Sequence, residues 1–133
     1  MKVEGRCHCG KISYEGIADP ARVRLCHCSD CQMLSGSAYR VVVAIGKDSF
    51  VLCSGEPKVY IKTAESGARR VQAFCGDCGS PVYATSEHDP QMYALRVGCL
   101  KQRAELAPKL QIWRRSALEW AEDLHGVEQR DRQ

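Results

Sequence analysis

Nine cysteines in a chain of 133 residues constrain its fold more than any other feature of the sequence. Seven of them form three short groups: Cys7 with Cys9, Cys26 with Cys28 and Cys31, and Cys75 with Cys78. An odd number of cysteines cannot pair off completely as disulfides within one chain. Cysteines separated by a single residue also suit a metal better than a disulfide. We therefore interpret the groups as metal ligands, with a secreted disulfide scaffold as the weaker alternative.

Two of the groups together complete one closed zinc site. A structural zinc ion takes four ligands in a tetrahedron, and cysteines one or two residues apart let a single turn present two sulfurs to the same metal. Such a site is predicted from Cys7, Cys9, Cys75 and Cys78. The remaining trio then predicts a second zinc site on Cys26, Cys28 and Cys31. Two zinc ions per chain are therefore expected.

The three-cysteine site is the candidate catalytic centre, because three protein ligands leave a fourth position for water or a substrate. The alternative is that His8, His27, Cys99 or Asp30 fills that position and makes the site structural. Both histidines lie between two cysteines, so we expect their rings to point away as spacers. Zinc with three thiolates carries a net charge of about −1, which disfavours water activation and favours a substrate thiol as the fourth ligand.

The composition predicts a single soluble domain in the cytoplasm. Hydrophobic residues make up 44% and charged residues 26% of the chain, and no apolar run approaches the roughly 20 residues of a membrane span. Cysteines and a histidine stand where a secretory signal would need an apolar stretch. The net charge of +3 is small and scattered, so a nucleic-acid partner is not expected.

Short runs rich in valine, isoleucine and tyrosine between turn-forming residues predict a mainly β fold. The predicted strands are 11–15, 22–25, 39–45, 49–53, 58–63, 70–74, 81–85 and 92–97. Turns at 46–48 and 54–57 predict that three consecutive strands, beginning at 39–45, form an antiparallel meander. We therefore expect a small antiparallel β-sheet domain held together by zinc.

One helix is predicted, near the C-terminus. Ser116 is a candidate N-cap with Glu119 three residues later, and the segment to Leu124 would end at Gly126. The domain is expected to span residues 1–126, with 127–133 as a disordered tail.

Several further residues are interpreted as structural. The isolated Cys53 and Cys99 lie in apolar runs and are expected in the core. Trp113 and Trp120 are expected to pack against the core and the helix. The arginines nearest to the trio, Arg24 and Arg40, are expected to be solvated rather than to bind a substrate carboxylate.

Three segments carry a family resemblance: GRCHCG at 5–10, CHCSDCQ at 26–32 with SGS at 35–37, and FCGDCGSP at 74–81. In this order, and with the SGEP turn at 54–57, they resemble the glutathione-dependent formaldehyde-activating enzyme family, which also includes centromere protein V. The resemblance covers about residues 3–115. Two positions depart from the pattern: Gln111 stands where relatives commonly have histidine, and Cys99 where threonine is usual.

The resemblance implies a mainly β fold with the same division of cysteines between a structural and a second zinc. It also implies an activity, the formation of S-hydroxymethylglutathione from glutathione and formaldehyde, which is classed with the carbon–sulfur lyases. Two other functions remain open. One is a binding module in which both zinc ions are structural, and the other is a glutathione carrier or metal store without turnover.

Overall fold

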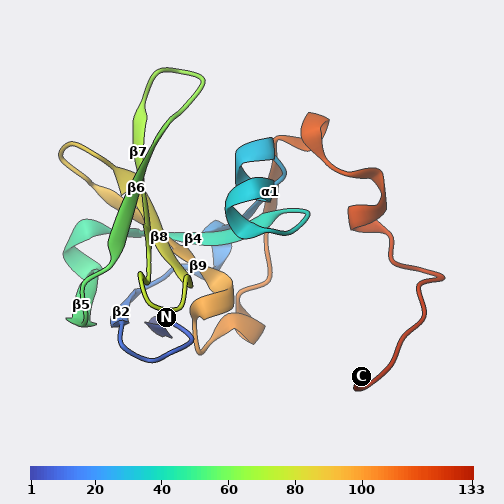
Figure 1. The fold of residues 1–133 in the computed structure, drawn as a ribbon, viewed down its shortest axis with the longest axis horizontal. Helices are drawn as coiled ribbons and strands as arrows, with labels where there is room; N and C mark the ends of the chain where they lie inside the picture. Colours follow the sequence, from blue (N-terminus) through green and yellow to red (C-terminus); the bar gives the residue numbers. More distant parts are fainter.

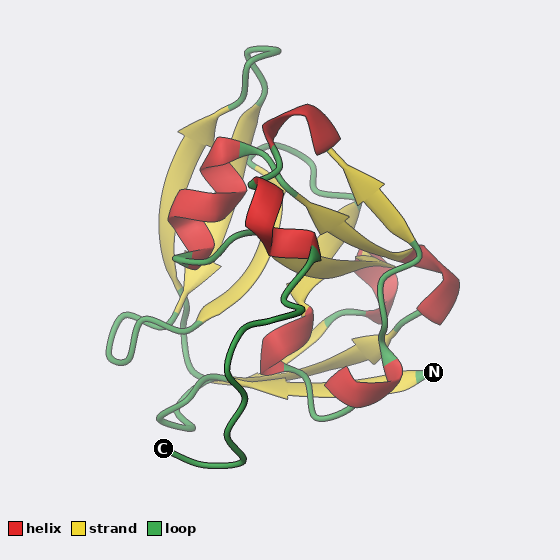
Figure 2. Ribbon diagram, turned by 90° about the vertical axis from the view of Figure 1, so that its right-hand side faces the viewer, coloured by secondary structure: helices red, strands yellow, loops and turns green.

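The computed structural model describes residues 1–133 and contains two β-sheets and one α-helix (Figures 1 and 2). The strands are β1 (Lys2–Arg6), β2 (Ser13–Ile17), β3 (Val23–Cys26), β4 (Arg40–Gly46), β5 (Val51–Ser54), β6 (Lys58–Thr63), β7 (Arg69–Phe74), β8 (Pro81–Ser86), β9 (Met92–Arg96) and β10 (Leu110–Ile112). The helix is α1 (Ser29–Ser35). Six 3₁₀ segments connect these elements: η1 (Pro20–Arg22), η2 (Lys47–Ser49), η3 (Val97–Cys99), η4 (Arg103–Glu105), η5 (Arg114–Ser116) and η6 (Glu119–Glu122).

A small sheet has the strand order β1-β2-β5, and a large sheet has the order β10-β3-β4-β9-β8-β7-β6. The core lies between them, where Val43 and Leu95 are paired across the large sheet and pack with Val3 and Tyr14 of the small one. All four of these side chains are buried. The mainly β fold predicted from the sequence is therefore confirmed.

All eight predicted strands are present, with ends shifted by at most two residues. The predicted meander beginning at β4 is wrong, because β5 pairs with β2 of the small sheet. The segment η2 turns the chain out of the large sheet after β4, and all four residues of β5 are exposed. The consecutive antiparallel strands are instead β6 to β9. Two further strands were not predicted, β1 and the short β10, which runs parallel to β3.

The predicted C-terminal helix is also wrong, because η5 and η6 are isolated 3₁₀ turns there. Ala121 is the sole buried residue of this segment, so no apolar face is covered that would stabilise an α-helix. Trp113 and Trp120 are exposed rather than packed in the core, and Figure 1 shows the C-terminal segment leading away from the sheets. No helix in the structure has both the length and the apolar character to cross a lipid bilayer.

The pairing of β1 with β2 depends on a close contact at Gly5. Gly5 lies opposite the buried Tyr14, and a Cβ at this glycine would be 2.2 Å from the tyrosine ring. We expect Gly5→Ala to destabilise the protein by about 1–3 kcal/mol, because the buried ring has to move. Gly46→Ala is the control, since no atom lies within 4 Å of its added Cβ and its φ is −70°. Melting temperatures check this, and equal values for the two variants would contradict the contact.

Candidate functional site

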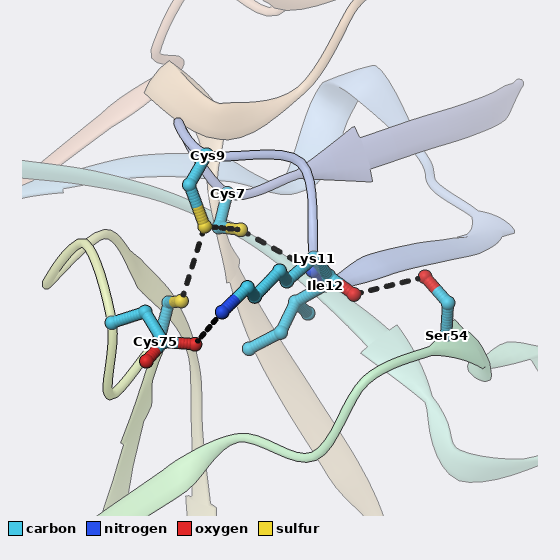
Figure 3. A network of polar contacts seen from close by, with 7 residues as sticks. Cys7, Cys9, Lys11, Ile12, Ser54 and Cys75 are labelled. Atoms are coloured by element: carbon cyan, nitrogen blue, oxygen red, sulfur yellow. Dashed lines mark hydrogen bonds and ion pairs between the residues drawn. The ribbon is translucent and has the colours of Figure 1, made fainter.

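Two turns bring four cysteines together at one end of the sheets. Cys7 and Cys9 lie in the loop after β1, and Cys75 and Cys78 in the turn between β7 and β8. Their four sulfurs all lie within 4.8 Å of one another. The Sγ atom of Cys9 is 3.5 Å from that of Cys7 and 3.7 Å from that of Cys75 (Figure 3).

These distances suit a metal. A disulfide would need about 2.05 Å between sulfurs, and all nine cysteines are free thiols. A tetrahedral zinc with bonds of about 2.3 Å separates its sulfurs by about 3.8 Å. The four thiols therefore fit a closed zinc site that joins a loop of the small sheet to a turn of the large one.

The surroundings of this site favour the deprotonated form, which binds metal, at Cys7 and Cys78. At Cys9 the Lys11 N–H acts to lower the pKa, but the neighbouring thiols raise it overall to about 11. The Cys7 sulfur accepts a hydrogen bond from the Ile12 N–H at 3.3 Å. The Ser80 hydroxyl, 3.3 Å from the Cys78 sulfur, together with nearby backbone N–H groups lowers the pKa of that thiol to about 5. The Lys11 ammonium, which forms a 2.9 Å ion pair with Asp77, adds positive charge beside the cluster (Figure 3).

The second cluster is built where β3 runs into α1. Cys26 ends β3, Cys28 is the N-cap of α1, and Cys31 lies in its first turn, with the three sulfurs within 4.8 Å of one another. The Cys28 sulfur accepts a hydrogen bond from the Cys31 N–H at 3.3 Å. Burial acts to raise the pKa of Cys28, but this hydrogen bond, those with the other two thiols and the charge of Lys62 lower it overall. Burial raises the pKa of Cys31 to about 12 against the opposing charge of Arg40.

No fourth protein ligand completes the trio, since the group of potential ligand atoms contains only the three cysteines. The Asp30 carboxylate forms an ion pair with Lys62 at 2.7 Å, and the Cys99 thiol donates to the Pro81 carbonyl at 3.2 Å. His8 is exposed, and its backbone N–H bonds to Ser80 beside the other cluster. The donor set of the trio is therefore three thiols, which fits a zinc ion with one open position.

The fourth candidate, His27, is fully buried and is held away from the sulfurs. Its Nε2 atom lies 2.7 Å from the Oε1 atom of Gln111, and its ring packs edge-on against Tyr39. The Gln32 side chain also ties this turn down, donating to the carbonyls of His27 at 2.8 Å and of Ser116 at 3.0 Å. Both histidines are therefore spacers with respect to the metal clusters, as predicted.

A cleft of about 660 Å³ opens on the face of the large sheet that α1 overlies. None of the three cysteines lines it, but Arg40, which lies opposite Cys26, does. Leu34 and Ser35, at the end of α1, form part of its wall. Figure 2 shows α1 lying against the strands of the large sheet. The most polar part of the lining comes from Tyr39, Arg40, Tyr60, Gln72, Arg96 and Cys99. A substrate in this cleft would lie next to the helix that carries Cys31.

This architecture agrees with a comparison of the whole sequence. A family profile described as glutathione-dependent formaldehyde-activating enzyme matches residues 2–116, which include both cysteine clusters. The chain belongs to this family. A search among curated proteins gave no significant match. A crystal structure of a Rhodobacter sphaeroides protein superposes with a TM-score of 0.63 at 20% identity, covering 81% of this chain and 98% of that one, and so shares its fold.

The structure of this family member corrects two of the expectations for single residues. Cys53 is exposed on β5, not buried in the core. Arg40 is half-buried in the cleft rather than solvated, whereas Arg24 is exposed as expected. Cys99 is partly buried and lines the cleft.

Three cleft residues were missed altogether: Tyr60, Gln72 and Arg96. They lie more than 25 residues from the trio in sequence, and only the strand pairing brings them beside it. A signal existed for one of them, because Arg96 is a charged residue within the apolar run from Tyr93 to Val97.

Proposed function

We propose that this member of the family is a zinc-dependent enzyme of the carbon–sulfur lyase type that adds a glutathione-like thiol to a small aldehyde such as formaldehyde. The observation that carries this proposal is a cluster of three thiols with no fourth protein donor beside an open cleft. In the proposal Cys26, Cys28 and Cys31 hold the reactive zinc, and Cys7, Cys9, Cys75 and Cys78 hold a structural one. A cytoplasmic location, where glutathione is kept reduced, belongs to the same proposal.

The reaction is an addition without net oxidation. A bond forms between the thiol sulfur and the carbonyl carbon, the carbonyl π electrons move to oxygen, and that oxygen takes up the proton that the thiol released. Zinc in the trio would supply a position that favours the thiolate form of the substrate. The positive charges of Lys62 and Arg40 act on the thiols of Cys28 and Cys31 and offset the negative charge of the site.

Cobalt substitution tests whether glutathione binds through its sulfur. In protein that holds two cobalt ions, we expect thiolate-to-cobalt charge-transfer absorption to grow when glutathione is added. S-methylglutathione is the control, because a thioether cannot supply a thiolate. The response is expected to strengthen as the pH rises toward the thiol pKa of about 8.5, since binding releases a proton. A spectrum unchanged by millimolar glutathione would favour the binding module.

Turnover distinguishes the enzyme from a carrier that uses the same open site. The enzyme accelerates the exchange between hydrated formaldehyde and its glutathione adduct, which NMR exchange spectroscopy measures at equilibrium. A carrier gives the cobalt response but leaves the exchange rate at its uncatalysed value.

A further inference from the structure

Two arginines lie in the cleft beside the trio, and we propose that they bind a carboxylate carried by the substrate thiol. The anion site follows from the geometry of the arginines themselves. The identity of its ligand as a thiol substrate rests on the proposed function above.

The strand pairing places the arginines on the same face of the sheet as the trio. Arg40 of β4 lies directly opposite Cys26 of β3, so their Cβ atoms are about 5 Å apart. Two residues further along β4, Val42 lies opposite Arg96 of β9. Side chains two residues apart on one strand, or opposite each other on neighbouring strands, share a face. A short thiol that carries a carboxylate can therefore place its sulfur at the trio and its carboxylate at the two arginines.

The same face also brings in Gln72. It lies opposite Ala84 of β8, which in turn lies opposite Ala94 of β9, two residues from Arg96. Because Ala84 and Ala94 have small side chains, the Gln72 side chain can reach across β8 to the arginines. Its Oε1 atom accepts hydrogen bonds from Arg96 Nη2 at 2.8 Å and from Arg40 Nη1 at 3.2 Å. One neutral oxygen thus holds two guanidinium groups together.

Three nitrogen atoms of the two arginines are buried without a hydrogen-bond partner. Arg96 is 5% exposed, and its Nε and Nη1 atoms are buried without a hydrogen-bond partner. The Nε atom of Arg40 is buried and unpartnered as well. Neither arginine forms a salt bridge with a carboxylate, although seven other lysine and arginine side chains of the chain do. Buried donors and buried charges without partners are costly, and such groups normally have a ligand or counter-ion.

The arginine pair is electrostatically suited to an anion. Burial and repulsion from Arg40 lower the pKa of Arg96 to about 9, so its guanidinium remains charged at neutral pH. A guanidinium presents its N–H groups in a planar fork that matches the two oxygens of a carboxylate. The surrounding wall contributes the aromatic rings of Tyr39, Tyr60 and Phe74. A rival explanation is that the arginines only balance the negative charge of the trio, and a neutral substrate then binds as well as an acidic one.

A matched pair of thiols separates these explanations. In the cobalt-substituted protein, 3-mercaptopropionate and the neutral 3-mercaptopropionamide bind through the same sulfur and differ in the carboxylate. We expect the acid to bind about tenfold or more tightly than the amide, the range for hydrogen bonds to a buried charge. Equal affinities would overturn the anion site and leave the proposed function standing.

Two variants test whether the preference for the acid over the amide depends on the arginine pair. Arg96→Met removes one guanidinium, and Gln72→Glu places a carboxylate against both arginines with almost no change in shape. Each is expected to abolish the preference for the acid, and Gln72→Glu is also expected to raise the melting temperature. Arg69→Met is the control, because Arg69 is exposed on the same strand as Gln72 and pairs with Glu87 outside the cleft. A preference that survives in Gln72→Glu contradicts the proposal.

A further measurement does not depend on thiol binding. In the zinc-loaded protein, the Nε–H NMR signals of Arg40 and Arg96 are assigned with the variants Arg40→Lys and Arg96→Lys. These signals are expected to shift downfield with propionate but not with propionamide. If no thiol binds the cobalt protein but propionate shifts these signals, the proposed function fails and the anion site stands. If propionate leaves both signals unchanged, the anion site is wrong whatever the thiols do.

Discussion

Serine in place of Cys75 is expected to unfold the domain or to lower its melting temperature by tens of degrees. Structural zinc contributes about 10 kcal/mol or more to folding, which is as large as the whole stability of an ordinary domain. Here the four thiols join the loop after β1 in the small sheet to the turn between β7 and β8 in the large sheet. Loss of one thiolate therefore weakens both the metal and the connection between the sheets. Circular dichroism melting with a zinc count on the same sample checks this.

Cys53→Ser is the matched control for that variant. Cys53 is also a free cysteine, but it is exposed on β5 and belongs to neither cluster. Its replacement is expected to leave two zinc ions and an unchanged melting temperature. If Cys75→Ser melts with the same midpoint as Cys53→Ser, the four-cysteine site does not hold the fold together.

The second large effect is expected from serine at Cys28, and it falls on catalysis rather than on stability. Cys28 caps α1 by accepting the Cys31 N–H, and serine is a good N-cap residue, so the helix start is preserved. The trio also closes a loop of only a few residues, whose metal contributes little to joining distant parts of the chain. We expect one zinc ion to be lost and the formaldehyde exchange to slow by about a thousandfold, since a catalytic metal is worth several kcal/mol.

Zinc content, melting temperature and exchange rate of Cys28→Ser are measured beside those of Cys75→Ser and Cys53→Ser. The expected pattern is a native-like melting temperature, one zinc ion and an exchange rate about a thousandfold lower. Equal destabilisation of the Cys28 and Cys75 variants would make the central cluster structural and favour a binding module. An exchange rate equal to that of Cys53→Ser would exclude the trio as the reactive site.

The grouping of the cysteines could be predicted from the sequence because it depends on local spacing and on the number of ligands that zinc takes. Strand positions were also predictable, since alternation and turn residues act over short distances. Strand partners were not, and β5 shows why: nothing within its four residues indicates pairing with β2, about 40 residues earlier. The helix α1 was missed because it has seven residues and a single buried one, Cys31, too few for a helical pattern.

The cleft was the least predictable part of the candidate site. Arg40 follows the trio closely in sequence and was considered, but its burial depends on β4 lying between β3 and β9. Arg96 stands out as a charge in an apolar run, but its position beside Gln72 and the trio depends on the pairings β3–β4, β4–β9, β9–β8 and β8–β7 taken together. The exposed Trp113 and Trp120 show the reverse error, because a large apolar side chain indicates burial only when another element is there to cover it.

The parallel pairing of β10 with β3 affects the order in which the two metal sites can be completed while the chain is being synthesised. Ile112 lies opposite Cys26, its carbonyl accepts the His27 N–H at 3.1 Å, and Gln111 holds the His27 ring. The ligands of the four-cysteine site have all been made once residue 78 leaves the ribosome, whereas these supports of the trio arrive more than 30 residues later. Domains fold as their segments emerge from the N-terminus onward. The nascent chain is therefore expected to load its structural metal first, and the trio at residues 26–31 reaches its final form only when the C-terminal segment docks.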